Sequence, residues 1–232
     1  MKKKTIVLIN LLAIAVLVLL LAVRCKKEDN IVVIPVNSIK DIDGNIYKTV
    51  NIGLQVWMAE NLKVTHFRNG EPIPYANEWG HWMTHNNAAC CDYNSHPGNI
   101  KFFGKLYNGY AVTDKRNIAP EGWHVASDTE WDALASYLGG YTIAGGKLKD
   151  TTISWIKPNA GATNESGFSA QPGGYRFFYS QYSDANKGAF WWTSTEYDSA
   201  YIGFRVLRNS HTYLFGSKTY KGYGYSVRCV KD

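Results

Sequence analysis

Cysteine and charged residues are both scarce in this chain of 232 residues. Four cysteines are too few for a disulfide scaffold, so a hydrophobic core has to stabilise the fold. Charged residues make up 19% of the sequence, whereas 45% is hydrophobic and 14% is aromatic. Together with 21 glycines, this balance argues against intrinsic disorder and against a coiled coil. It favours a compact domain with much β-structure and many aromatic side chains.

Acidic residues are absent from the first 24 positions, which hold the four basic residues Lys2, Lys3, Lys4 and Arg24. The whole chain has 25 Lys and Arg against 19 Asp and Glu, a net charge of +6. Without those four residues, 21 basic side chains stand against 19 acidic ones, and the net charge falls to +2. The basicity is therefore an N-terminal feature, and we expect no nucleic-acid partner.

A hydrophobic run follows the basic head from residue 6 to residue 23, and only Asn10 interrupts it. A basic head with an apolar body is typical of an export signal. Cys25 comes next, and residues 21–25 resemble a bacterial lipoprotein cleavage box, although Arg24 stands where a small residue is usual. The favoured interpretation is a signal peptide at 1–24, followed by a lipidated Cys25 and a tether at 25–37. It makes the chain an outer-membrane lipoprotein that faces the periplasm or the cell surface, with the membrane as its partner.

Two other interpretations of this segment stay open. The apolar run is long for a cleaved signal and barely long enough to span a membrane. It could therefore remain as an uncleaved anchor, or the chain could be simply secreted. All three interpretations place the domain outside the cytoplasm.

Sequence motifs of several enzyme classes are missing from the chain. There is no Gly-x-Ser-x-Gly elbow, and the glycine pairs at 139–140 and 145–146 lack the context of a phosphate-binding loop. No repeat with a period of about 20 to 50 residues is visible. We expect no catalytic residue and no cofactor.

A hairpin is predicted around Asp43-Gly44, between strands at 38–42 and 45–50, because a tight two-residue loop suits residues that tolerate positive φ. Asp41, Asp43 and Asn45 also resemble the start of a calcium loop. However, Ile46 stands where that loop needs glycine, and no glutamate closes it. We therefore interpret the segment as a turn.

A helix is predicted after Ser127, which forms a capping box with Glu130. Apolar residues recur at helical spacing up to Leu138, and Gly139-Gly140 ends the helix. Asp128 and Glu130 could also be imagined as a glycosidase pair, but the cap and the helix dipole account for both carboxylates.

The other predicted elements are a short helix at 105–112 and several strands. The strands are expected at 174–179, 189–194, 201–208, 211–215 and 223–230, with Tyr223, Tyr225, Val227 and Cys229 on one face of the last. Strands do not alternate with helices, which argues against a doubly wound parallel sheet. The predicted fold class is α+β, with two short helices and an antiparallel, aromatic-rich sheet.

Histidines and cysteines gather in the segment 68–104, which is predicted as a long surface loop. Imidazole and thiolate groups bind zinc, so the segment is a candidate metal site, but no glutamate follows His81 as a zincin requires. We expect no metal, and keep His81, His85, Cys91 and His96 as weak candidates beside Cys90 and Asp92. A disulfide from Cys91, or from Cys90, to Cys229 is the alternative use of these thiols.

The tryptophans, together with Tyr93, divide into two groups by their surroundings. Five lie in segments that look core-facing: Trp57, Trp123, Trp131, Trp155 and Trp191. Four other aromatic residues lie in or near loops among Asn, Asp and Gly: Trp79, Trp82, Tyr93 and Trp192. Flat aromatic faces beside amide and carboxylate groups suit sugar rings, so this second group is a hypothetical binding site for a glycan.

Nine segments carry a resemblance to a known family. They are DGNIYKTV (43–50), QVWMAENL (55–62), GKLYNGYAV (104–112), PEGWHV (120–125), EW (130–131), GFSA (167–170), PGGYR (172–176), WWTSTE (191–196) and SVRCV (226–230). In this order they resemble the Fibrobacter succinogenes major paralogous domain family, over roughly residues 39–231. The resemblance implies one domain, 38–232, frequently on a lipoprotein, with a C-type-lectin-like fold shared with formylglycine-generating enzymes and no established catalytic activity.

Two activities known in that fold are not expected. The calcium and sugar motifs of C-type lectins are absent, and no equivalent of the reactive cysteine pair of the formylglycine-generating enzymes is present. The expected function is therefore non-catalytic binding of an extracellular glycan or a surface protein. An adhesin or fimbria-associated assembly subunit is the alternative, and a hydrolase of an extracellular polymer has the least support.

Overall fold

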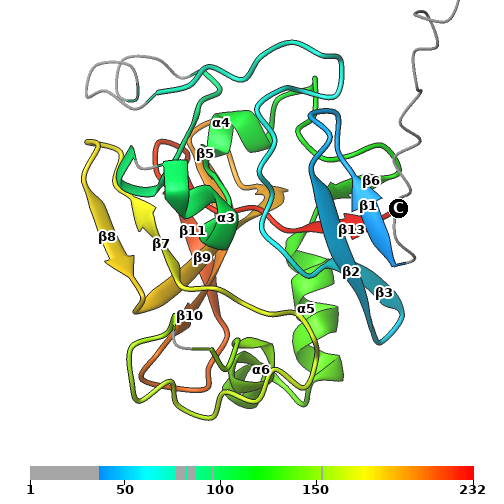
Figure 1. Ribbon diagram of the computed structural model, residues 1–232, viewed down its shortest axis with the longest axis vertical. Helices are drawn as coiled ribbons and strands as arrows, with labels where there is room; N and C mark the ends of the chain where they lie inside the picture. Colours follow the sequence, from blue (N-terminus) through cyan, green and yellow to red (C-terminus); the bar gives the residue numbers. More distant parts are fainter. Residues whose placement is uncertain (1–36, 77–81, 83–86, 96, 153) are drawn as a thin grey trace, which may run out of the picture. The chain divides into compact units, whose positions relative to one another are not determined.

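The computed structural model describes residues 37–76, 82, 87–95, 97–152 and 154–232. The predicted signal peptide, Cys25 and nearly all of the tether lie outside these residues, as do Trp79, His81, His85 and His96. The described part is mixed α/β, mostly strands with a few short helices (Figure 1). The predicted mixture of helices with a largely antiparallel sheet is confirmed. In the described residues, no helix is long and apolar enough to cross a membrane.

A five-stranded antiparallel sheet brings together the two ends of the described chain. Its order is β1 (Ser38–Lys40), β2 (Ile46–Ile52), β3 (Gln55–Met58), β13 (Cys229–Lys231) and β6 (Trp123–Val125). The predicted hairpin is confirmed as the pair β1–β2, with Lys40 opposite Ile46. Its loop spans residues 41–45 and is not the two-residue loop expected. Asp41 and Asn45 close this longer loop, since the Asp41 carboxylate accepts from the Asn45 amide at 2.9 Å and the Asp41 amide donates to the Asn45 carbonyl at 3.0 Å.

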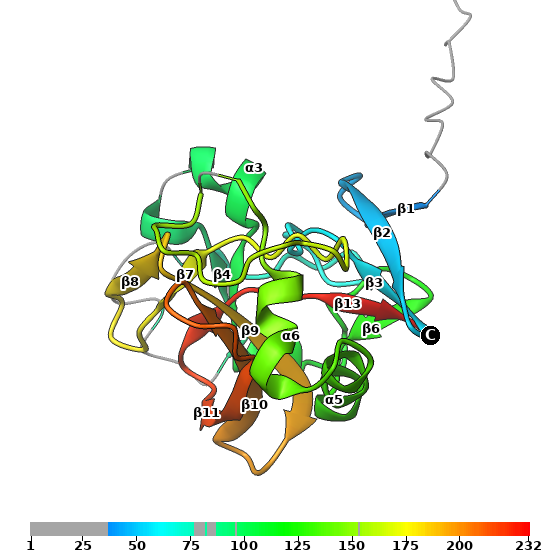
Figure 2. The ribbon, with the colours of Figure 1, turned by 90° about the horizontal axis from the view of Figure 1, so that it is seen from below.

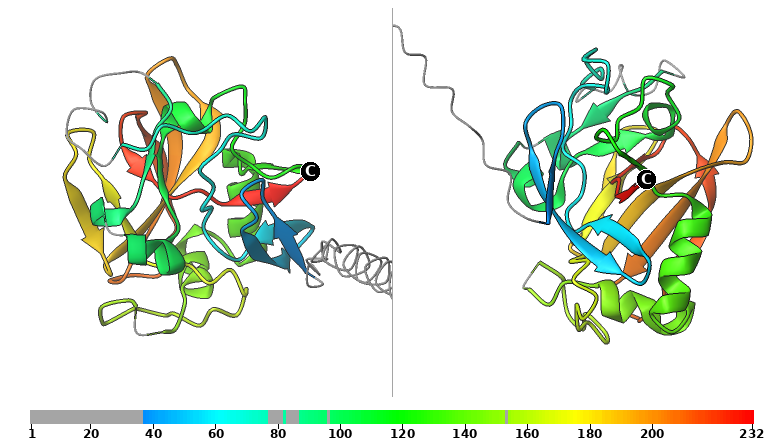
Figure 3. Two further views of the ribbon diagram at one scale, coloured as in Figure 1. Left: turned by 45° about the horizontal axis from the view of Figure 1, so that its top comes forward. Right: turned by 90° about the vertical axis from the view of Figure 1, so that its right-hand side faces the viewer.

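An eight-stranded sheet forms the other part of the domain. Its order is β11 (Phe215–Tyr220), β10 (Tyr201–Arg208), β9 (Gly188–Glu196), β7 (Gly173–Arg176), β12 (Gly224–Tyr225), β5 (Leu106–Asn108) and β4 (Cys90–Cys91), and β8 (Tyr182–Ala185) pairs with β7. The strands pair antiparallel except for β7 and β9. The yellow, orange and red strands of this sheet curl across the domain (Figure 3).

The strand predictions are confirmed in part. Strand β10 occupies the predicted residues, and β9 extends two residues beyond the predicted end. The strand expected at 211–215 instead forms at 215–220, because the preceding segment packs on the helices. There the Leu214 amide donates to the Tyr141 carbonyl at 2.8 Å. The strand expected at 223–230 is split into β12 and β13, so that the last segment of the chain passes from one sheet to the other.

Helix α5 (Asp128–Tyr137) confirms the predicted capping box. The Ser127 hydroxyl accepts from the Glu130 amide at 3.3 Å, and the Glu130 carboxylate accepts from the Ser127 amide at 2.7 Å. A second helix, α6 (Tyr141–Leu148), follows at once and was not predicted. Gly145 lies within it because a Cβ there would come within 2.6 Å of the Thr212 carbonyl oxygen.

The helix predicted at 105–112 is wrong in its first half. Residues 106–108 form β5, and only Gly109–Val112 are helical, as the single turn α4. The Asn108 side chain caps this turn by accepting from the Ala111 amide at 2.9 Å. Three other one-turn elements are η2 (Tyr93–Ser95), η3 (Pro97–Asn99) and α3 (Ile100–Phe103).

Two apolar clusters lie on opposite faces of β9 and β10. Helices α5 and α6 cover one face (Figures 1 and 2). On that face Trp131 and Leu148 pack with Trp191 and Leu207. The alternate residues of the same strands point into the other cluster. The five tryptophans predicted for the core are all buried, at 5% exposure or less. The strand expected at 223–230 is split, but its predicted common face is confirmed. Tyr225, Val227 and Cys229 are buried in one cluster, and Tyr223 packs against it.

Candidate functional site

The aromatic residues proposed for sugar stacking do not form a surface site. Trp192 is fully buried, and its indole nitrogen donates to the Tyr107 carbonyl at 2.6 Å. Trp82 is 3% exposed, and its indole nitrogen donates to the Gly222 carbonyl at 2.8 Å. The prediction is wrong for both residues, because rings in the interior offer no face to a ligand.

Tyr93 is half-buried and packs against Tyr182, with ring centroids 5.2 Å apart. Trp79 lies outside the described residues. The described members of the predicted group therefore do not converge on one surface.

A different set of aromatic rings lines a groove of 390 Å³. We call it the aromatic groove, and its rings belong to Tyr175, Phe177, Phe190, Phe204, Phe215, Tyr223 and Tyr225. Val206, Arg208, His211 and Thr219 complete its lining. Its volume falls within the range of about 300–1,000 Å³ that is usual for small-molecule sites.

Strand periodicity places these rings. In β10, Phe204, Val206 and Arg208 point to the face opposite the helices, whereas Leu207 points toward them. Phe190 of β9 and Tyr225 of β12 continue the same surface, and their ring centroids lie 5.4 Å apart. The rings fix one another by edge and stacked contacts, so the groove is formed before any ligand enters.

A charged group closes one side of the groove. The Arg208 guanidinium pairs with the Asp184 carboxylate at 2.6 Å and lies 5.1 Å from the centre of the Phe190 ring. His211 lies beside it, and burial together with the charges of Lys149 and Arg208 lowers the pKa of its imidazole. The imidazole is therefore neutral over a wider pH range than usual. Its Nδ1 accepts from the Tyr213 amide at 3.3 Å, which leaves Nε2–H as the donor for a ligand.

The groove tyrosines keep their protons. Burial raises the pKa of Tyr175, Tyr223 and Tyr225 above the ordinary value. Their hydroxyl groups thus remain hydrogen-bond donors at physiological pH. The groove combines flat apolar faces with hydroxyl, imidazole and guanidinium groups at its edges.

Sequence reasoning missed the groove, although a signal for it exists. Aromatic residues two positions apart, at 175 and 177 and at 223 and 225, share one face of an extended segment. The opening between β9, β10 and β12 is a product of the fold, and no local pattern shows which of these rings stays accessible.

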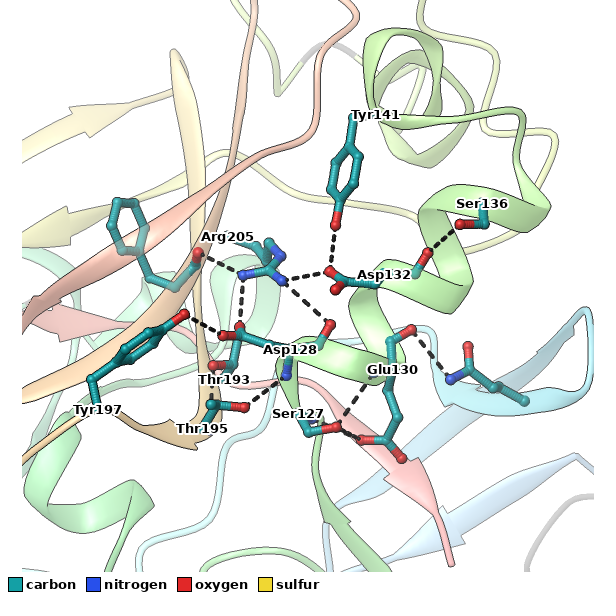
Figure 4. Close-up of polar contacts among 12 residues, drawn as sticks. Ser127, Asp128, Glu130, Asp132, Ser136, Tyr141, Thr193, Thr195, Tyr197 and Arg205 are labelled. Carbon is teal, nitrogen blue, oxygen red and sulfur yellow. Dashed lines mark hydrogen bonds and ion pairs between the residues drawn. The ribbon is translucent and has the colours of Figure 1, made fainter.

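The carboxylates weighed as a glycosidase pair are engaged elsewhere (Figure 4). Glu130 serves the helix cap and also contacts His124 Nε2 at 2.6 Å. Asp128 pairs with Arg205 at 2.7 Å and accepts from the Tyr197 hydroxyl at 3.0 Å. The interpretation of this motif as a helix cap is confirmed.

The predicted disulfide is wrong. Cys90, Cys91 and Cys229 are free, buried thiols, and Cys91 and Cys229 belong to different apolar clusters. Burial raises the pKa of all three, that of Cys90 to about 12, so the unreactive thiol form prevails.

The described members of the proposed metal cluster have other partners. Asp92 accepts from Lys105 at 2.8 Å and from the Tyr75 hydroxyl at 2.7 Å, and Cys91 packs against apolar side chains. No group of three or more potential metal ligands occurs in the ranges that the structure covers. The three histidines of the cluster lie outside those ranges.

The residues compared with a calcium loop form a turn, as we interpreted them. The Asp41 carboxylate accepts from the Asn45 side chain at 2.8 Å and from the Tyr47 hydroxyl at 2.6 Å. Asp43 accepts from the Thr65 hydroxyl at 2.8 Å. The two carboxylates thus hold the hairpin together and anchor it to the following segment.

Comparison with known proteins gives one match. Residues 50–231 match the model of the Fibrobacter succinogenes major domain. No curated protein and no solved structure matches the chain. Because the match covers most of the chain, the protein belongs to the Fibrobacter succinogenes major domain family.

Proposed function

We propose that this protein is an exported lipoprotein whose domain binds an extracellular glycan in the aromatic groove. The observation that supports this proposal is the groove itself, where five half-buried or exposed aromatic rings and two buried ones meet beside one arginine and one histidine. The C–H faces of a sugar ring pack on aromatic faces, and its hydroxyls need donors and acceptors at the edge. The groove offers both within 390 Å³.

The proposed role is binding without catalysis. Asp128 and Glu130 are committed to a cap and to ion pairs, and the described thiols are buried with raised pKa values. These arrangements support a surface that binds its ligand through shape complementarity and ring stacking. A C-type-lectin-like fold fits the curled antiparallel sheet with helices on one face, and we propose it as the finer description of the domain.

The export part of the proposal rests on the sequence of the first 25 residues. We propose lipid attachment at Cys25, a short tether, and display of the domain on the outer membrane. A displayed domain would meet polymeric carbohydrate or a surface protein, which are the ligands that the sequence led us to expect.

A glycan array followed by calorimetry tests the groove. Phe215 is 55% exposed and lines the groove, so Phe215→Ala removes a stacking face with little effect on the core. We expect it to weaken glycan binding about tenfold, since stacking of one ring contributes about 0.5–1.5 kcal/mol beyond its burial. Tyr137→Ala, on the outer face of α5 and 67% exposed, is the matched control and should change affinity less than twofold. Equal losses in both variants, or no glycan bound by the wild-type chain, would refute the proposal.

One observation favours the alternative role as an assembly subunit. Strand β11 stands at the end of the eight-stranded order within the described residues, and Phe215–Lys218 are exposed. An exposed edge strand can accept a strand from another chain. Such a subunit would bind its protein partner through β11 and would bind no sugar on the array.

A further inference from the structure

A second cavity, of 760 Å³, shares no lining residue with the aromatic groove. Its walls come from β2, the segment that follows β3, α3, and the loop segment that precedes β7. We call it the basic cavity. Its lining has more positive charge than negative: Lys48, Lys63, Lys101 and Arg228 are the cations, and Glu60 is the one acid.

The buried cation of this cavity is Arg228, which is 0% exposed. Its guanidinium donates to the side-chain oxygen of Asn61 at 2.6 Å and to the carbonyls of Met58 and Phe168 at 2.8 Å. It also donates to the Ser169 carbonyl at 3.2 Å. All four acceptors are neutral, and among the described residues no carboxylate lies within ion-pair distance of this guanidinium.

Burial without an ion-pair partner is costly for this charge. It lowers the pKa of Arg228 to about 9, although Glu60 partly opposes the shift. Glu60 itself pairs with Lys63 at 2.7 Å and accepts from the Lys48 amide at 3.1 Å. The single acid of the lining is therefore already shared. A second carboxylate, Asp150, contacts the lining, since it accepts from the Gln171 side chain at 2.7 Å and from the Thr152 amide at 2.6 Å. The four cations still outnumber these two acids, and a bound anion would balance the excess positive charge.

The remaining lining suits a sugar. Phe102 is 65% exposed beside Lys101, and it offers an accessible ring face. Ser154 and Gln171 line the cavity and are joined by a hydrogen bond of 2.7 Å. Hydroxyl and carboxamide groups of this kind exchange hydrogen bonds with sugar hydroxyls.

We propose that the basic cavity binds an acidic saccharide, with its carboxylate or sulfate group between Lys48 and Lys101 and a sugar ring against Phe102. The buried Arg228 acts through its charge, at the wall of the cavity. The site is separate from the aromatic groove, and it stands whether or not the groove binds a glycan.

Calorimetry on the full chain tests this site with three probes: trigalacturonate, a sulfated galactose trisaccharide and inorganic sulfate. The two saccharides distinguish carboxylate from sulfate as the acidic group. We expect at least one of them to bind, and its methyl-esterified or desulfated form to bind at least tenfold more weakly. Affinity should also fall as salt rises, because exposed lysines supply part of the attraction.

Matched double variants locate the binding. The double variant Lys48→Ala with Lys101→Ala should weaken saccharide binding at least tenfold. The control, Lys115→Ala with Lys231→Ala, removes the same charge from exposed positions outside the cavity. It should change the affinity for the saccharide less than twofold. Phe102→Ala should weaken the saccharide and leave the binding of sulfate unchanged.

Four results would overturn the proposal: no acidic saccharide bound, a neutral form bound equally well, equal losses in both double variants, or inorganic sulfate bound as tightly as the saccharide. The groove variant Phe215→Ala should leave this binding intact. Phe215→Ala therefore tests the aromatic groove and the lysine variants test the basic cavity, so that either proposal can fail without the other.

Discussion

At the scale of residues, buried cations link separate segments of this domain by donating hydrogen bonds to backbone carbonyls. Lys149 is fully buried, and its ammonium group donates to the carbonyls of Ala160, Arg208 and His211 at 2.7–3.2 Å. Arg228 does the same for the carbonyl of Met58, at the end of β3, and for that of Phe168, in the segment before β7. Each cation satisfies carbonyls from segments that are far apart in the sequence, and such bonds help a domain with long loops to pair its buried backbone groups.

The sequence could not show these roles, because their partners are far apart along the chain. Trp192 illustrates the same difficulty. The sequence places its segment near loops, but β9 continues to Glu196 and the ring is fully buried, with its indole nitrogen on the Tyr107 carbonyl. Burial of a particular aromatic residue depends on which strands cover it, and the sequence around it does not contain that information.

Histidine 124 gives a prediction at this scale. His124 contacts the Asp232 carboxylate with Nδ1 and the Glu130 carboxylate with Nε2, both at 2.6 Å. Burial opposes protonation, but the two carboxylates prevail and raise the pKa of His124. A pKa raised by folding stabilises the domain below the unfolded value of about 6.5, and this stability is lost as pH rises through the folded value.

Urea unfolding between pH 5.5 and 8.5 measures the effect. Relative to His124→Gln, the wild type should lose stability as pH rises, by less than about 1 kcal/mol because the imidazole is more than a third exposed. His211→Gln is the control with the opposite sign, since folding lowers the pKa of His211. The difference between wild type and that variant should rise with pH. A pH dependence that is unchanged by His124→Gln would contradict the assignment.

At the scale of elements, the sequence predicts those helices and strands that depend on interactions between residues close together in the chain. The capping box defined the start of α5, because its two hydrogen bonds lie within four residues. The alternating sequence at 201–208 predicted β10 for the same reason. Helix α6 was missed because Gly145 and Gly146 have low helix propensity, and it forms there through close packing against residues 212–213.

The cap itself can be tested by substitution. Ser127→Ala removes the hydroxyl that accepts from the Glu130 amide, and we expect a loss of about 1 kcal/mol in the free energy of unfolding. Ser136→Ala lies in the same helix, where its hydroxyl donates to the Asp132 carbonyl, and it should change stability by less than about 0.5 kcal/mol. Both values come from urea denaturation, and similar losses in the two variants would argue against the cap.

At the scale of the whole molecule, the family and the mixed α/β class follow from the ordered set of segments in the sequence. The division into two sheets could not be predicted from these segments, because it depends on the last part of the chain passing from β12 in one sheet to β13 in the other. The aromatic groove and the basic cavity are consequences of that arrangement. Each is assembled from segments that are far apart in the sequence, so neither could be located before the fold was known.

Lipid attachment is the prediction that concerns the whole molecule in its cell. The sequence around Cys25 predicts a mature chain that begins at this residue and carries lipid. Mass spectrometry of the protein extracted from membranes should show an acylated N-terminus, which Cys25→Ala or globomycin should abolish. An intact, unacylated segment 1–24 in the wild type would instead support an uncleaved anchor.

The claim that the aromatic groove binds a glycan is central to this account. Solution NMR of the isotope-labelled protein with the strongest array ligand tests it most directly. We predict chemical-shift changes concentrated on β10, β11 and the rings of Phe204, Phe215 and Tyr223, and we expect Phe215→Ala to need about tenfold more ligand for the same changes. Changes confined to residues elsewhere, or none at saturating ligand, would contradict it.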